Sequence, residues 1–302
     1  MRIDFDKILK TNAGYNNFMR DFRNGNLSRG YLFIGEDKVL RDEVLIRCVK
    51  TMFCTSENKP CGECAECAKI DNHNNLDVMY FGGDSFTKND ALRLKDECIV
   101  RPMTGDIKLL VVPNADAMEE LTQNKLLKTL EELPSYIMVI LSVSSETLVL
   151  PTIRSRMRKV YVGSGENAVK EFLSGKPYAD EIALCSNGLL QEAESLAKDV
   201  KFINYYEFAM SLLNDFPNSR VLGEKGRFFV EHKNDTIKIL RILMYVMYDN
   251  MKQNKTTYPT EALPNCIRAV GRGLEALDAF ANPNAVIDNV LLTILEEKSK
   301  CK

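Results

Sequence analysis

The sequence has no long apolar segment. Within its 302 residues, no apolar run approaches the roughly 20 residues that a membrane-spanning helix needs. The N-terminal segment MRIDFDKILK also lacks the apolar core of a signal peptide. These two absences favour a cytoplasmic protein without a membrane anchor.

A strong net charge is missing as well. The formal net charge is −2 at pH 7, so no global field draws the chain to nucleic acid. Contact with DNA would need a local patch or a partner. Apolar residues make up 45% and charged residues 27% of the sequence, which is ordinary for a globular protein. The length suits two or three domains of roughly 100–150 residues each.

Nine cysteines are present, and without an export signal we do not expect them to form disulfides. Four thiolates spaced C-x6-C-x2-C-x2-C can complete the tetrahedral shell of a structural zinc ion and leave no position for a catalytic water. Redox-active or accidentally clustered thiols and an iron–sulfur cluster are the alternatives. We interpret nearby His73 as a loop residue and the other cysteines as isolated thiols. The predicted ligands are Cys54, Cys61, Cys64 and Cys67.

Short apolar segments alternate with helix-length amphipathic segments over residues 1–163. This alternation predicts parallel strands joined by crossover helices. From residue 164 onward the patterns are helical, with a turn at Ser186-Asn187-Gly188 and a helix start at Asn282-Pro283-Asn284. The expected strands are 31–34, 78–81, 109–112, 137–142 and 160–162, and the expected helices in the first part are 38–53, 87–100 and 116–132.

The segment GYLFIGEDKVLRDEVLI, residues 30–46, has the strand–loop–helix layout of a phosphate-binding P-loop, G-x-x-x-x-G-K-[ST]. Gly35 keeps the first position of that pattern. The second glycine, the lysine and the hydroxyl residue are replaced by Leu40, Arg41 and Asp42. The scaffold of a nucleotide site is therefore predicted without its chemistry.

The replacements oppose phosphate binding. Leu40 adds a side chain where phosphates need close approach to the backbone, and Asp42 adds a carboxylate where a hydroxyl would bind magnesium. Glu36 and Asp37 bring two more negative charges to the loop. Arg41 keeps a positive charge but not the slim reach of lysine. We expect no ATP hydrolysis at this loop.

A second segment gives an independent indication. An ATPase of this class carries acidic residues at the end of a later strand, where they hold magnesium and orient water. In LLVVPNADAM those positions hold Pro113 and Asn114, which offer neither a carboxylate nor a base. Asp116, farther along, is expected to cap a helix N-terminus.

Three arginines alternate in LVLPTIRSRMRKVYV, at Arg154, Arg156 and Arg158. An arginine at a domain edge can reach the γ-phosphate bound by a neighbouring subunit, a device worth ~10³–10⁵ in rate. Pairing with local carboxylates such as Glu131 and Glu132 is the alternative, and spacing alone does not decide between the two.

Four segments together resemble the delta-prime subunits of bacterial DNA polymerase III clamp loaders, which are AAA+ proteins. They are GYLFIG, the four-cysteine segment, NKLLKTLEELP and LPTIRSRM. The resemblance implies an α/β AAA+ domain with a parallel sheet over 1–163, interrupted by a zinc module at 54–67. A small helical lid would follow at 164–203 and an all-α collar domain at 204–302.

The same resemblance implies roles for single residues. IRSR matches the family's Ser-Arg-Cys motif, which makes Arg156, beside Ser155, an arginine finger acting in trans; Met157 stands at the cysteine position. Ser142 lies near the sensor 1 position. Glu192 stands where the second sensor is usually basic, which argues against bound nucleotide.

The implied function is that of a stator, not an enzyme by itself, within the polymerase holoenzyme. It would assemble with the motor (gamma/tau) and delta subunits to load the sliding clamp on primed DNA, with structural Zn²⁺ and no ATP hydrolysis of its own. An ATP-hydrolysing motor subunit is the first rival, and it would bind nucleotide alone. A zinc-dependent nucleic-acid-binding module is the second, but Glu57, Glu63 and Glu66 flank the cysteines where basic and aromatic residues would be needed.

Overall fold

A computed structural model of the chain describes residues 3–83, 86–163, 166–214 and 219–301. The chain divides into two compact units. The first comprises Met1–Phe172 with Leu189–Gln191, and the second comprises Leu173–Gly188 with Glu192–Lys302. The predicted boundary after residue 163 adjoins residues 164–165, which lie outside the described residues. The predicted lid at 164–203 and the predicted collar at 204–302 stay predictions.

A five-stranded parallel sheet forms the centre of the first unit. Its order is β2-β3-β4-β1-β5, so β1 lies between β4 and β5. In such sheets ligands bind at the carboxyl ends of the strands where the strand order reverses, here beside β1 and β4. The expected strands are confirmed, as β1 (Gly30–Ile34), β2 (Val78–Tyr80), β3 (Lys108–Val112), β4 (Ile137–Val143) and β5 (Arg158–Tyr161).

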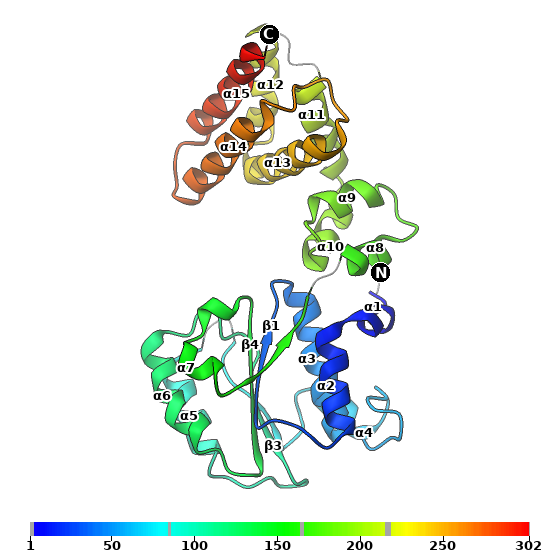
Figure 1. Ribbon diagram of the computed structural model, residues 1–302, viewed down its shortest axis with the longest axis vertical. Coiled ribbons are helices and arrows are strands. Elements are labelled where there is room, and N and C mark those ends of the chain that lie inside the picture. Colours follow the sequence, from blue (N-terminus) through cyan, green and yellow to red (C-terminus); the bar gives the residue numbers. More distant parts are fainter. Residues whose placement is uncertain (1–2, 84–85, 164–165, 215–218, 302) are drawn as a thin grey trace. The chain divides into compact units, whose positions relative to one another are not determined.

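Helices cover both faces of this sheet (Figure 1). One face carries α1 (Phe5–Thr11), α2 (Ala13–Arg23), α3 (Lys38–Phe53) and α4 (Ala65–Asp71). The other carries α5 (Lys88–Glu97), α6 (Glu120–Glu131) and α7 (Pro151–Arg154), with the 3₁₀ turn Glu146–Leu148 before α7. The predicted helix 38–53 matches α3, whereas α5 and α6 are shorter than predicted.

Strand β1 is buried along its whole length because helices cover both sides of the sheet. Tyr31 and Phe33 point into the core under α2 and α3, and Leu32 and Ile34 into the core under α6. This alternation is the period of two that a strand imposes. The ring of Phe18 from α2 meets Tyr31 edge-on at 5.2 Å between centroids. The side chains of β1 are therefore packed on both faces of the sheet.

The second unit is helical. Asn187 and Gly188, with φ of 50° and 74°, form the predicted turn, and the Asn282 side chain accepts a hydrogen bond from the Asn284 amide at the predicted helix start. Helix α8 (Glu166–Leu173) precedes this unit, and the 3₁₀ turn Lys233–Asp235 lies within it. Its helices are α9 (Ala179–Cys185), most of α10 (Leu190–Lys198), α11 (Phe202–Asn214), α12 (Ser219–Glu231), α13 (Thr236–Gln253), α14 (Leu263–Asp278) and α15 (Pro283–Lys300). The first two residues of α10, Leu190 and Gln191, belong to the first unit.

None of the helices in the described ranges combines the length and the apolarity that a bilayer span requires.

Gly35 ends β1 in a very tight position. A Cβ atom added there would meet the carbonyl oxygen of Val162, just after β5, at 2.3 Å. Gly83 is a matched contrast, because a Cβ atom there would meet no atom of the described residues within 4 Å. Gly35 is thus required by packing between two adjacent strand ends, whether or not phosphate is bound.

We predict that Gly35→Ala lowers the free energy of unfolding by about 1–3 kcal/mol, because backbone atoms must shift to admit the methyl group. Gly83→Ala is expected to change it by less than about 0.5 kcal/mol. Thermal and urea unfolding of the two variants measure the difference. Equal stability of both variants would contradict this account of Gly35.

Candidate functional site

A buried carboxylate lies at the N-terminus of α3, where a P-loop protein binds phosphate. Asp37 caps the helix: its Oδ1 accepts a hydrogen bond from the Leu40 amide at 3.1 Å. Its Oδ2 accepts a second one from the amide of Leu190, the first residue of α10, which belongs to the same compact unit. The Asp37 side chain is only 1% exposed. The chain's own anion therefore bonds amides from the starts of two helices.

Arg41 fills the same region from the inside. Its side chain is 2% exposed, and its Nε donates to the Oγ atom of Ser142 on β4 at 2.8 Å. Its Nη1 donates to the carbonyl oxygen of Gly35. In a working P-loop the residue at this position reaches out to the terminal phosphates. Here the guanidinium turns back and bonds Gly35 in the loop and Ser142 on β4.

The sequence reading missed this inward orientation, although a signal was present. Arg41 stands three, four and seven residues before Val44, Leu45 and Cys48, all buried in one core. That spacing puts Arg41 on the apolar face of α3, not on its solvent face. Leu40 is also fully buried in this core. Two replaced P-loop positions therefore serve packing.

Asp42 takes a different place from the one expected. Its carboxylate forms an ion pair with Lys38, one helical turn earlier, and its side chain is 41% exposed. The negative charge is thus compensated locally on the surface. The carboxylate that the structure puts at the helix N-terminus is Asp37.

The expected cap at Asp116 is wrong. Helix α6 begins at Glu120, and its N-cap residue, Glu119, makes no side-chain capping bond. The Oδ1 atom of Asp116 instead accepts a hydrogen bond from the amide of Ser144, just past β4, at 2.6 Å. This amide lies beyond the end of its strand, so the carboxylate supplies the acceptor that the sheet does not. Asp116 therefore joins the loops that follow β3 and β4.

The four clustered cysteines converge on one point. Their sulfur atoms all lie within 4.8 Å of one another, a group that could hold a metal ion. Sγ of Cys54 is 3.5 Å from Sγ of Cys61 and 3.8 Å from Sγ of Cys64. Four sulfurs at ~2.3 Å from a tetrahedral zinc ion would be ~3.8 Å apart. The cluster is held by the end of α3, where Cys54 stands, and by the start of α4, which Cys64 caps.

The surroundings of the cluster lower the pKa of two of its thiols, which favours the thiolate form that binds a cation. Backbone hydrogen bonds from Thr55 and Cys67 lower the pKa of Cys64 to about 5. Backbone hydrogen bonds from Glu63 and Cys64 likewise lower the pKa of Cys61. Burial raises the pKa of Cys67 to about 12, so this thiol needs a bound cation to ionise near neutral pH. All four positions are protein sulfurs, which suits a closed structural site.

Arg156 stands at the edge of the sheet, two residues before β5. Its Nη2 lies 2.5 Å from Oε1 of Glu131, and its Nη1 donates to the Thr152 carbonyl at 2.7 Å and to the Ser155 Oγ at 3.4 Å. The side chain is 37% exposed. Of the two carboxylates considered from the sequence, the arginine meets Glu131. A cavity of about 100 Å³ adjoins it, lined by Ser28, Arg29, Gly30, Leu130, Glu131, Leu133 and Arg156.

The two neighbouring arginines are bound elsewhere. Arg154 Nη1 lies 3.3 Å from Oε1 of Glu146, and Arg158 Nη2 lies 2.8 Å from Oδ1 of Asp21. Asp21 is buried, so removal of Arg158 would leave its charge uncompensated. Arg154 and Arg158 therefore form ion pairs that hold segments of the first unit together.

The cradle and Arg156 lie at opposite ends of β1. Gly35 follows its carboxyl end, whereas a Cβ atom on Gly30, at its amino end, would lie 3.5 Å from the carbonyl oxygen of Arg156. Five strand residues at ~3.3 Å each separate the two ends by about 16 Å. Arg156 therefore cannot serve a phosphate bound in the cradle of its own chain.

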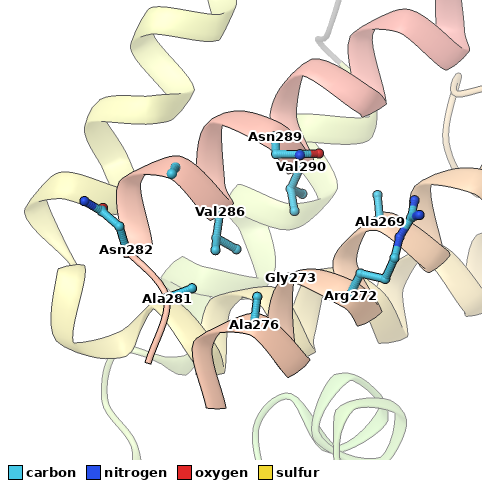
Figure 2. Close-up of a pocket in the computed structure, with 10 residues that line it drawn as sticks. Ala269, Arg272, Gly273, Ala276, Ala281, Asn282, Val286, Asn289 and Val290 are labelled. Carbon is cyan, nitrogen blue, oxygen red and sulfur yellow. The ribbon is translucent and has the colours of Figure 1, made fainter. Parts of the chain in front are cut away.

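A second cavity lies in the second unit, between α14 and α15 (Figure 2). Its volume is about 380 Å³, and its lining is mostly small: Ala269, Gly273 and Ala276 face Val286 and Val290. A Cβ atom on Gly273 would lie 3.0 Å from Cγ1 of Val286, so the two helices pack closely at its base. Arg272, Asn282 and Asn289 supply the polar groups around it. This set contains no acid, base or nucleophile arrangement that indicates chemistry.

A model of the family described as DNA polymerase III, delta subunit, matches residues 10–164, about half of the chain. The chain belongs to this family. The matched segment contains the filled cradle, the cysteine cluster and Arg156. The resemblance to DNA polymerase III subunits is thus confirmed for the family, while the delta-prime role stays a prediction.

Three curated relatives carry related names. The chain is 30% identical over 137 residues to DNA polymerase III subunit tau/gamma of Haemophilus influenzae, covering 44% of this chain and 20% of that protein. It is 24% identical over 243 residues to subunit gamma of Buchnera aphidicola, covering 72% and 65%. It is 26% identical over 186 residues to subunit tau of Escherichia coli, covering 57% and 29%. The chain therefore spans less than two thirds of the length of each of these relatives.

A solved structure of a DNA polymerase III gamma subunit-related protein from Thermotoga maritima is also similar. The TM-score is 0.52 at 20% sequence identity, covering 93% of this chain and 99% of that one. At this identity the likeness shows the fold: a parallel sheet with helices on both faces, followed by a helical region.

We predict that Asp37→Ala lowers the free energy of unfolding by about 2–4 kcal/mol, because it removes a helix cap and leaves a buried amide without an acceptor. The free energy of unfolding of Asp37→Asn should lie between those of the wild-type chain and Asp37→Ala, because asparagine caps well but cannot offer two carboxylate oxygens. Chemical unfolding followed by circular dichroism measures the series. Asp4→Ala, which removes the exposed cap of α1, is the control and should cost less than about 1 kcal/mol. Equal losses in the Asp37 and Asp4 variants would contradict a special role of Asp37.

Proposed function

We propose that this chain is a delta-prime-type stator of a DNA polymerase III clamp loader. It assembles with the motor (gamma/tau) and delta subunits, hydrolyses no ATP itself, and offers Arg156 to the ATP bound by a neighbouring motor subunit. The assembled complex opens the sliding clamp and loads it on primed DNA. One observation carries the proposal: the cradle is filled by Asp37 and Arg41, while Arg156 is exposed at the opposite end of the sheet.

The filled cradle supports the absence of ATP hydrolysis. A triphosphate needs the free amides at the start of α3 and an outward-reaching cation. The Asp37 carboxylate already binds one of these amides, and Arg41 is committed to Ser142 and Gly35. Binding would require breaking buried hydrogen bonds and placing phosphate beside a carboxylate, and both changes cost free energy.

The position of Arg156 supports the action in trans. An arginine finger stabilises the charge that develops on the γ-phosphate oxygens during transfer, and its planar fork of N–H donors suits that task. Arg156 lies at a sheet edge, far from its own cradle, and its side chain is partly exposed. Ser155, next to it, donates to the Thr152 carbonyl and helps to close the turn that carries the finger.

An ATP-hydrolysing motor subunit is the second candidate. The curated relatives named gamma or tau favour it. The interior position of Arg41 weighs against it, because the replaced lysine would have to contact phosphate. Residues Pro113 and Asn114 at the end of β3 weigh against it too, since neither can hold magnesium through a carboxylate.

We also propose that the four cysteines hold a structural Zn²⁺. Purified under reducing conditions, the chain should contain about one zinc ion, and chelation should expose thiolates and lower the unfolding temperature. Cys64→Ser should lose the metal, whereas Cys301→Ser, at an exposed cysteine outside the cluster, should retain it. Metal analysis by plasma mass spectrometry decides the matter. A chain without zinc, or one containing iron and sulfide, would refute this proposal.

The function is tested with Arg156→Ala in a reconstituted loader. We expect an unchanged fold and a lower clamp- and DNA-stimulated ATPase rate. The rate should fall by roughly the part that the neighbouring site contributes to the total, because a finger raises the rate at its own site by ~10³–10⁵. Arg156→Lys should restore little, since lysine lacks the planar fork. The rate of phosphate release is the measurement.

Two controls accompany this variant. Arg20→Ala removes an exposed arginine of α2 that does not line the Arg156 cavity, and its loader should keep the full rate. The isolated chain should hydrolyse MgATP no faster than background. An unchanged rate with Arg156→Ala would reject the finger, and substantial ATP turnover by the isolated chain would favour the motor subunit.

A further inference from the structure

Three chain segments meet around Arg156. The first is the residue pair before β1, the second is the end of α6, and the third is the turn after α7. Arg29, from the first, donates from Nη1 to the Leu133 carbonyl at 2.9 Å, and its own carbonyl accepts from the Val139 amide of β4 at 2.8 Å. The end of α6 is thereby tied to the sheet. Glu131, two residues before Leu133, meets the guanidinium of Arg156.

The Arg156 guanidinium is held along one edge. Nη1 donates to the Thr152 carbonyl, and Nη2 pairs with the Glu131 carboxylate. A free arginine side chain has many rotamers, and this freedom must be lost when the side chain engages a phosphate. The contact with Glu131 restricts that freedom in advance, which is how preorganisation raises the rate of a chemical step.

The same contact contributes little to stability. The two side chains are 37% and 46% exposed, and ion pairs this exposed add little to the stability of a fold because water screens them. A pair of this kind can be removed without unfolding the chain, so an effect on rate can be separated from an effect on the fold.

We propose that Glu131 is a positioning residue for Arg156: it fixes the guanidinium at the sheet edge in the orientation that meets the neighbour's γ-phosphate. The inference rests on the proposed function. Arg29 acts one step further away, by fixing the end of α6 that carries Glu131. Glu132, the next residue, is the matched control, because it is exposed and its side chain makes no hydrogen bond or ion pair within the described ranges.

The test uses the reconstituted loader and measures the Arg156-dependent part of the ATPase, defined as the rate lost on Arg156→Ala. Glu131→Ala should reduce this part by about threefold to tenfold, with the KM for ATP changed by less than about twofold, because the finger acts mainly in the transition state. Glu131→Gln keeps an oxygen that accepts from Nη2 and should restore at least about half of the loss. Glu132→Ala should leave the rate unchanged.

A double-mutant cycle separates positioning from a structural role. In the Arg156→Ala background, Glu131→Ala should cause no further loss, because the residue it positions is already gone. An equal loss in both backgrounds would overturn the inference, and so would a lowered unfolding temperature of Glu131→Ala or a failure of Glu131→Gln to restore activity.

The two hypotheses fail in different ways. If Arg156→Ala lowers the rate and Glu131→Ala does not, the finger stands and the positioning role is refuted. If Arg156→Ala leaves the rate unchanged, the proposed function loses its finger and Glu131 loses its role with it. If Glu131→Ala raises the rate, the carboxylate restrains the arginine instead of orienting it, which also refutes the inference.

Discussion

The hydrogen bonds of the buried Asp37 carboxylate and of the inward Arg41 guanidinium fix the loop after β1 within the first unit. Asp37 caps α3 and also binds the first amide of α10, and Arg41 joins the loop after β1 to Ser142 on β4. In a nucleotide-binding relative of this fold, phosphate would bring these elements together. Here two side chains do so. The carboxyl ends of these strands are thus held in place by side chains of the protein and need no bound ligand.

Different contacts organise the opposite end of β1, its amino end, where Arg156 is partly exposed. Arg29, Glu131 and Arg156 meet there through partly exposed hydrogen bonds and one ion pair. Packing of α6 and α7 against the sheet sets their positions, and that packing does not involve the cradle. The contacts of the cradle and the contacts of Arg156 therefore involve different residues. Under the proposed function, this separation allows a chain with a filled cradle to assist ATP hydrolysis in a neighbouring subunit.

Much of this arrangement could be predicted from the sequence because local patterns determine it. The apolar runs of β1, β3 and β4, the stripe of α3 and the spacing of the four cysteines all led to elements that the structure contains. Side-chain direction was harder. Asp116 was expected to cap a helix, yet it bonds Ser144, because the amide past β4 becomes its neighbour only after the sheet has formed. The choice of Glu131 over Glu132 likewise depends on how the end of α6 meets the turn after α7, which forms only in the folded chain.

The inward position of Arg41 also bears on how the chain responds to the cell's energy supply. A ligand that binds only the folded state adds to its stability in proportion to the logarithm of ligand concentration. Under the proposed function, the first unit has no such dependence on ATP, because its own residues occupy the place of the phosphates. Its folded population and its shape would stay constant when nucleotide is scarce, and a subunit with this property can serve as a fixed reference against which its partners move.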